Sequence, residues 1–193
     1  MLTLSKKAQK MPASPIRKLV PYADEAKKRG TKVYHLNIGQ PDIISPDQAL
    51  DAVKMNKLTL VEYPNSAGIE SYRKGLAKYY QGIGINVEYT DINITTGGSE
   101  ALQIALAVTC DPDDEVIVME PFYTNYNSFA LQNDVKLVPI TTTIDTGFAL
   151  PSVEEFEKKI TPKTKGIILC NPANPTGVLY TKESIEKLGE VAK

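Results

Sequence analysis

The sequence predicts an α/β protein built on an open, largely parallel sheet that is covered by helices. From Asp91 onward, short apolar segments with strand character alternate with segments of helical period, which is typical of parallel sheets. Residues 166–170 are almost continuously apolar, as strands covered on both faces are. Loops rich in glycine, proline and asparagine follow several of the expected strands, and open α/β sheets bind ligands at that edge.

The first part of the chain predicts helices joined by loops and one short strand. Residues 15–30 carry apolar side chains at helical spacing and end in a basic turn followed by Gly30, which is a helix stop signal. Glycine and proline at 39–42 and 63–68 predict loops. We therefore expect helices at 15–30, 46–57 and 69–80, and a strand at 33–38.

The second part predicts a regular alternation of strands and helices. We expect strands at 92–95, 116–119, 136–140 and 166–170, with helices at 101–108, 126–132 and 154–159 between or beside them. A last helix should open at Thr181, a residue type favoured as a cap. No glycine stop follows it before Lys193, so we expect the sequence to end within an element.

Composition narrows the range of partners. Of 193 residues, 42% are hydrophobic and 23% are charged, which is ordinary for globular proteins, and no apolar stretch approaches the length of about 20 residues that spans a bilayer. The net charge of -1 does not favour nucleic-acid binding. Cys110 and Cys170 have no metal-ligand spacing, and the N-terminus has no secretory pattern. We expect a cytoplasmic protein without membrane, nucleic-acid or metal partners.

The strongest local motif is ITTGGSEAL at 94–102, in which an expected strand passes through Gly97, Gly98 and Ser99 directly into a helix. Such a turn offers backbone N–H groups, a small hydroxyl and the positive end of a helix to an anion. It lacks the lysine of a nucleotide-binding P-loop and the glycine spacing of dinucleotide folds. A phosphate site is therefore one interpretation, and an ordinary strand-to-helix turn capped by Ser99 is the other.

Three further segments also follow expected strands. NPANPTG at 171–177 would place Asn174 at the carboxyl end of the strand at 166–170, as a ligand contact or as part of a rigid turn. EPFYTNY at 120–126 would place Tyr123 where a flat ligand could stack, although buried core aromatics are the commoner explanation. NIGQPD at 37–42 would expose backbone at Gly39 to a carboxylate, or would be only a turn.

Taken together, in this order and at these separations, the four segments resemble the class I aminotransferases of the aspartate aminotransferase type, over essentially the whole chain. The resemblance implies the fold-type I scaffold that binds pyridoxal 5'-phosphate. It implies that Gly97, Gly98 and Ser99 cradle the cofactor phosphate, and that Tyr123 stacks on the pyridine ring. It also implies that Asn174 hydrogen-bonds the ring hydroxyl oxygen and helps to hold the substrate carboxylate.

The resemblance extends to subunit and domain organisation. Gly39 matches the backbone contact to the substrate carboxylate, and Tyr63 matches the tyrosine that reaches the cofactor phosphate of a neighbouring subunit, so a homodimer of the full-length protein is implied. Residues 1–45 would be the N-terminal segment of the small domain, and residues 46–193 the first part of an incomplete large, cofactor-binding domain.

Some family motifs have no match in this sequence. The lysine that binds the cofactor covalently lies, in the family, in a serine-lysine segment followed by Gly-x-Arg, and no such segment occurs here. Ser5 and Lys6 do not qualify, because no Gly-x-Arg follows them. No arginine of this chain matches the residue that clamps the substrate carboxylate, and we expect His35, the single histidine, to be structural.

The function that the resemblance implies is transfer of an amino group between an amino acid and a 2-oxo acid, through pyridoxal phosphate. Without the matching lysine, these 193 residues alone are expected to be inactive or nearly so. Two alternatives stay open. One is a carbon–sulfur lyase of the same fold, which shares the same motifs, and the other is a non-catalytic truncated product.

Overall fold

The computed structural model describes residues 2–193. Contacts divide the chain into two compact units. The first combines the chain up to Tyr22 with Gly97–Lys193, and the second comprises Ala23–Thr96. The domain division expected at residue 45 stays a prediction.

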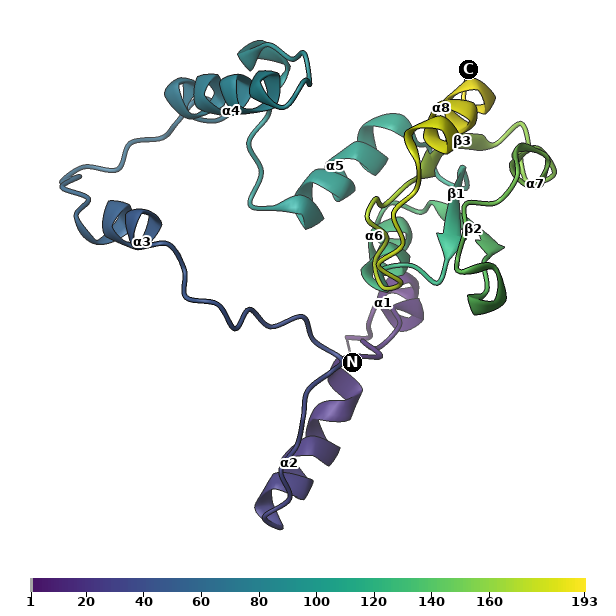
Figure 1. The fold of residues 1–193 in the computed structure, drawn as a ribbon, viewed down its shortest axis with the longest axis horizontal. Coiled ribbons are helices and arrows are strands. Elements are labelled where there is room, and N and C mark those ends of the chain that lie inside the picture. Colours follow the sequence, from purple (N-terminus) through teal and green to yellow (C-terminus); the bar gives the residue numbers. More distant parts are fainter. Residues whose placement is uncertain (1) are drawn as a thin grey trace. The chain divides into compact units, whose positions relative to one another are not determined.

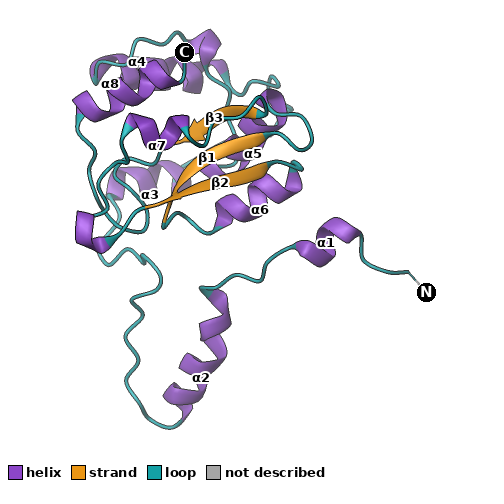
Figure 2. Ribbon diagram, turned by 90° about the vertical axis from the view of Figure 1, so that its right-hand side faces the viewer, coloured by secondary structure: helices purple, strands orange, loops and turns teal. Residues whose placement is uncertain are grey.

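The first unit is built on a parallel sheet of three strands (Figures 1 and 2). The strands are β1 (Glu115–Glu120), β2 (Lys136–Thr141) and β3 (Thr164–Ile168), and β1 lies between the other two. Both pairings are parallel, which confirms the fold class and three of the expected strands. The fourth residue of β1, Val118, lies opposite both Pro139 and Ile168.

One face of β1 packs against two helices, α5 (Gly98–Thr109) and α6 (Asn125–Gln132). Side chains alternate between the two faces of a strand, so Val116 and Val118 point the same way. Both are almost fully buried in a cluster with Leu106 of α5 and three residues of α6, Tyr126, Phe129 and Ala130. This cluster fixes α5 and α6 against the sheet.

The other face of β1 is covered by α7 (Val153–Glu157) and α8 (Lys182–Val191). Ile117 and Met119 belong to a second buried cluster, together with Ile140, Phe156 and Leu188. Phe156 and Ile117 are 0% exposed. Burial of each such side chain contributes about 1.5–3 kcal/mol, so the sheet is held from both sides, as the apolar character of its strands predicts.

The expected helices are confirmed, with small shifts at their ends. Thr181 caps α8 as predicted, because its Oγ1 accepts a hydrogen bond from the Ser184 N–H at 3.2 Å. A short helix at the N-terminus, capped by Ser5, was not predicted. The remaining helical elements are α1 (Lys6–Lys10), a 3₁₀ turn (Arg17–Leu19) that continues into α2 (Val20–Lys28), α3 (Asp47–Lys54), α4 (Glu70–Gly82) and 3₁₀ turns at Tyr89–Asp91 and Ile144–Thr146.

Two expected strands, at 33–38 and 92–95, are wrong, since neither segment has strand structure. A strand is defined by the hydrogen bonds of a neighbouring strand, and an alternating apolar pattern alone does not provide that neighbour. The Ile94 N–H instead donates to the carbonyl of Ala67, at 3.0 Å. Ile94 therefore packs on a turn and does not pair in the sheet.

That turn, at Gly68, organises the second unit. Gly68 has φ +99°, a conformation that side-chain-bearing residues rarely adopt, and a Cβ added to it would collide with the side chain of Ile94. Arg73 of α4 is 8% exposed and donates from Nε to the Gly68 carbonyl at 3.3 Å and from Nη1 to the Tyr89 carbonyl at 3.2 Å. Arg73 therefore joins three segments of this unit, which is a structural role.

We predict that Gly68→Ala lowers the free energy of unfolding by about 1–3 kcal/mol, because it adds both backbone strain and a collision with Ile94. Gly75→Ala is the matched control, since Gly75 lies within α4 with open space around it. It should raise stability by up to about 1 kcal/mol. Urea unfolding measures both changes, and equal effects of the two substitutions would contradict this account of the turn.

Candidate functional site at the carboxyl edge of the sheet

The loops that follow β1 and β3 meet at one edge of the sheet. The two strands are parallel neighbours, so the chain leaves both of them on the same side. A cavity of about 20 Å³, room for about one water molecule, lies where the loops meet. Its lining includes Phe122 and Tyr126 after β1, and Cys170, Asn174 and Tyr180 after β3. The structure therefore places Asn174 beside the aromatic segment that contains Tyr123.

The glycine turn begins α5. The short segment 110–114 joins α5 to β1, and the helix packs against this strand, so α5 and β1 run in opposite directions. The first turn of α5 therefore points toward the edge where β1 ends. Gly97 has φ +141° and precedes the helix, and a Cβ added at Gly97 or Gly98 would meet no atom within 4 Å. Gly98 and Ser99 are exposed and lie outside the lining of the small cavity.

This turn has the properties that bind an anion. The first N–H groups of a helix have no partner inside the helix, and the helix dipole is positive at that end. The open space above the two glycines leaves the backbone accessible to a phosphate group. The turn at Gly97–Ser99 therefore fits a cofactor phosphate, although Glu100, an acidic residue, lies in the same turn.

Tyr123 is fixed at two points. Its hydroxyl oxygen accepts a hydrogen bond from Asn125 Nδ2 at 2.7 Å, and its ring meets the Tyr126 ring edge to face, with centroids 5.6 Å apart. The Phe122 and Tyr126 rings stack at 6.0 Å. Tyr123 is only partly buried, so it contacts the core through one side and leaves another side accessible. Both interpretations of this aromatic segment, core and ligand platform, are compatible with that position.

The loop that carries Asn174 is closed by another asparagine. Asn171 Oδ1 accepts from the Tyr180 N–H at 2.9 Å, and Asn171 Nδ2 donates to the Tyr180 carbonyl at 3.5 Å. A side chain thus makes the two hydrogen bonds that a neighbouring strand would make. Tyr180 is 8% exposed and anchors the end of the loop in the core.

Backbone contacts complete the loop between these anchors. The Ala173 N–H donates to the Val178 carbonyl at 2.8 Å, and the Gly177 N–H donates to the Ala173 carbonyl at 2.7 Å. Gly177 has φ +73°, which favours glycine at that position. Asn174, inside this closed loop, is exposed. The loop therefore presents the Asn174 side chain to solvent from a fixed backbone.

Two buried phenols border the small cavity. Burial, and then the nearby Cys170 thiol, raise the pKa of Tyr126 to about 12. The same two causes raise the pKa of Tyr180. Both phenols stay protonated at neutral pH, as an ordinary tyrosine does.

Sequence reasoning missed Asn171, Tyr126 and Tyr180 as residues that shape this edge. The signal for Asn171 was its position directly after a strand, in a segment where two prolines cannot donate backbone hydrogen bonds. Gly39 and Tyr63 belong to the second unit, where both are exposed, and Tyr63 is 104% exposed. Their expected contacts with substrate and cofactor stay predictions, as do the binding roles of all the site residues.

Comparison with known proteins identifies the family. Residues 31–193 match the family model described as aminotransferase class I and II. The aspartate/prephenate aminotransferase of Thermus thermophilus is 31% identical over 194 residues, which cover 100% of this chain and 50% of that protein. The glutamate-pyruvate aminotransferase of Escherichia coli is 34% identical over 180 residues, which cover 90% of this chain and 44% of that protein.

Comparison with solved structures gives the same family. The Thermus thermophilus aspartate aminotransferase with maleate superposes with a TM-score of 0.87 at 31% identity, and the match covers 100% of this chain and 50% of that one. An alanine aminotransferase from Pyrococcus furiosus has a TM-score of 0.87 at 32% identity and covers 98% of this chain and 49% of that one. The parallel sheet and its edge loops are thus those of an α/β aminotransferase fold. The chain belongs to the class I and II aminotransferase family, and it spans about half the length of these relatives.

Neither a membrane-spanning segment nor a metal cluster is found in the part of the chain that the structure describes. No helix within residues 2–193 is long and apolar enough to cross a bilayer. The same residues contain no group of three or more histidine, cysteine, aspartate or glutamate side chains placed to hold a metal ion.

We predict that Asn171→Ala lowers the free energy of unfolding by about 1–2 kcal/mol, because it leaves the Tyr180 backbone groups without their partner. Asn174→Ala, in the same loop, should change it by less than about 0.5 kcal/mol, because Asn174 is exposed. Urea unfolding and the exchange rate of the Tyr180 amide measure the difference. A larger loss from Asn174→Ala than from Asn171→Ala would contradict the assigned roles.

Proposed function

We propose that this chain supplies the phosphate-binding and ring-binding part of a pyridoxal-phosphate-dependent aminotransferase, which exchanges an amino group between an amino acid and a 2-oxo acid. One observation carries the proposal: the Tyr123 segment and the Asn174 loop meet at one edge of a sheet on which the helix that begins at the glycine turn packs, in a chain of the aminotransferase family. When bound, the cofactor supplies an electron sink for the bonds at the substrate Cα.

Each group has a defined role. Backbone N–H groups at Gly98 and Ser99, with the Ser99 hydroxyl, would hold the phosphate, and charge-assisted hydrogen bonds of this kind contribute roughly 1.5–3 kcal/mol each. The Tyr123 ring, fixed by Asn125 and Tyr126, would cover the flat face of the pyridine ring. The Asn174 amide would donate to the ring hydroxyl oxygen and orient the substrate carboxylate.

Covalent binding of the cofactor needs a lysine, and no lysine of this sequence lies in a motif that matches the family's. Amino transfer requires an amine to hold the cofactor aldehyde and a base to move the substrate Cα proton. We propose that no lysine of these 193 residues takes these roles, so the chain alone is inactive or nearly so. The relatives do not single out one substrate pair, because one is named for aspartate and prephenate and the other for glutamate and pyruvate.

We further propose that the full-length protein is a cytoplasmic homodimer, in which Tyr63 contacts the cofactor phosphate of the partner and Gly39 contacts the substrate carboxylate. The full exposure of the Tyr63 side chain supports this, because a large exposed aromatic is available to a partner. The relatives reported above are named as aminotransferases, so the carbon–sulfur lyase alternative is not proposed.

We predict that the chain binds pyridoxal phosphate weakly and that Ser99→Asp weakens this binding by at least about tenfold, because a second negative charge faces the phosphate. Glu100→Gln should strengthen it by removing an acidic group from the same turn. Ser152→Asp is the control, since it makes the same change at the cap of α7 and should leave affinity unchanged. Calorimetric titration measures all three, and identical affinities for wild type and Ser99→Asp would contradict the proposed phosphate site.

A further inference from the structure

Helix α6 ends in a turn that leaves one carbonyl in need of a partner. The Asp134 N–H donates to the Leu131 carbonyl at 3.2 Å, and the Val135 N–H donates to the Ala130 carbonyl at 2.9 Å. Asp134 itself has φ +56°. This is the double hydrogen-bond pattern that commonly closes a helix, and it does not use the carbonyl of Gln132, the last helical residue.

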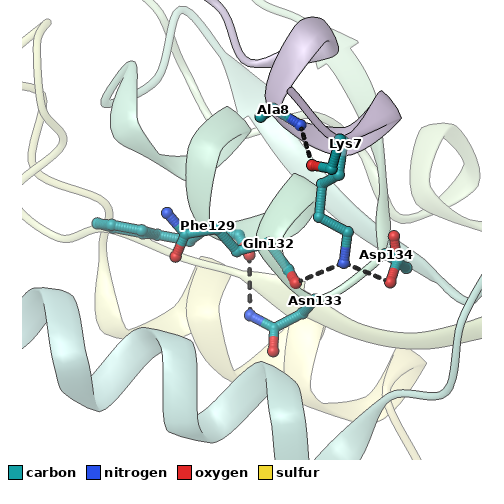
Figure 3. Close-up of polar contacts among 7 residues, drawn as sticks. Lys7, Ala8, Phe129, Gln132, Asn133 and Asp134 are labelled. Atoms are coloured by element: carbon teal, nitrogen blue, oxygen red, sulfur yellow. Dashed lines mark hydrogen bonds and ion pairs between the residues drawn. The ribbon is translucent and has the colours of Figure 1, made fainter. Parts of the chain in front are cut away.

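Lys7 of α1 is the hydrogen-bond partner of the Gln132 carbonyl. Its Nζ donates to the Gln132 carbonyl at 3.0 Å and to Asp134 Oδ2 at 2.6 Å, and Figure 3 shows the side chain reaching from α1 to both oxygens. A carboxylate at the negative end of a helix is unfavourable by itself. The Lys7 ammonium group therefore offsets the Asp134 charge and caps the helix at the same time.

Helix α1 depends on such contacts. It has five residues, Lys6–Lys10, far fewer than an isolated helix needs in water. The Ser5 Oγ accepts from the Ala8 N–H at 3.1 Å and caps its start, but α1 contains no buried residue. A contact with the rest of the unit is therefore required to hold α1 in place, and Lys7 provides it.

The chain after α1 reaches the opposite end of α6. Residues 12–15 and the first turn of α6 line an open cavity of about 230 Å³. The Thr124 Oγ1 atom is buried and has no hydrogen-bond partner within residues 2–193. Thr124 and Asn125 both line the cavity, and Asn125 also donates to the Tyr123 hydroxyl. Residues 5–15, the N-terminal strap, thus contact α6 at its last turn through Lys7 and at its first turn through 12–15.

We propose that Lys7 is a latch that holds the N-terminal strap closed over the first turn of α6, and that release of Lys7 from Gln132 and Asp134 opens the cavity beside Asn125. The latch itself is independent of the proposed function. Its one link to the site, the hydrogen bond from Asn125 to the Tyr123 hydroxyl, matters for ligand binding only if that function holds. The Lys7 and Asp134 side chains are 39% and 51% exposed, and exposed ion pairs are weak and screened by salt, so we expect the latch to open reversibly.

Amide hydrogen exchange of the 193-residue chain tests the latch, with Gln9 reporting on α1 and Arg17 on the far end of the strap. The Gln9 N–H donates to the Ser5 carbonyl, and the Arg17 N–H donates to Ser14 Oγ. We expect Lys7→Met to speed exchange at both amides about fivefold, and Asp134→Asn to give a smaller increase, since the Gln132 contact remains. Exchange at Val118, in the core, should not change.

Two controls separate the latch from general effects of charge. Lys10→Met removes a lysine from the same helix and should leave both amides at wild-type rates, and Lys7→Arg should restore most of the protection. Raising NaCl from about 0.05 M to about 0.5 M should speed exchange in the wild type and not in Lys7→Met. Faster exchange at Gln9 with no change at Arg17, or no salt dependence in the wild type, would overturn the proposal.

Discussion

The central strand β1 is the element on which the rest of this structure depends. Its residues Val116, Ile117, Val118 and Met119 are between 0% and 7% exposed, so its backbone groups have little access to water. Buried N–H and C=O groups must find partners, and β1 finds them in two parallel neighbours. Because the strands are parallel, their carboxyl ends are fixed at one edge, and the loops that leave them meet there.

The edge is shaped by side chains that pack and hydrogen-bond within the protein. Tyr126 packs between Phe122 and Tyr123 and lies against the core, so the helix that carries it sets the position of the aromatic segment. Asn171 replaces a strand partner for Tyr180 and so closes the loop that presents Asn174. The interactions that pack the core at this edge therefore also set the geometry of the candidate site. Helix α6 takes part in these interactions and also contacts the N-terminal strap.

Sequence patterns predicted the parts of this structure that depend on local periodicity and on chain order. The continuous apolar segments at 116–119 and 166–170 predicted covered parallel strands because such strands bury both faces. The glycines at 97 and 98 predicted the turn that opens α5. The same rules failed at 92–95, where a strand was expected but no partner strand is present, and Ile94 packs on the Gly68 turn. Contacts between distant residues, such as Lys7 with Asp134, leave no periodic signal and were not predictable from sequence.

The central claim is that the turn at Gly98 and Ser99, the Tyr123 segment and the Asn174 loop form one binding edge. An amide NMR titration of the 193-residue chain with two ligands tests it most directly. We expect inorganic phosphate to shift the amides of Gly98 and Ser99 alone, and pyridoxal phosphate to shift these two together with Tyr123 and Asn174, at one common affinity. Shifts from pyridoxal phosphate that spare these four amides, or that fit different affinities at the turn and at Asn174, would contradict a single cofactor site.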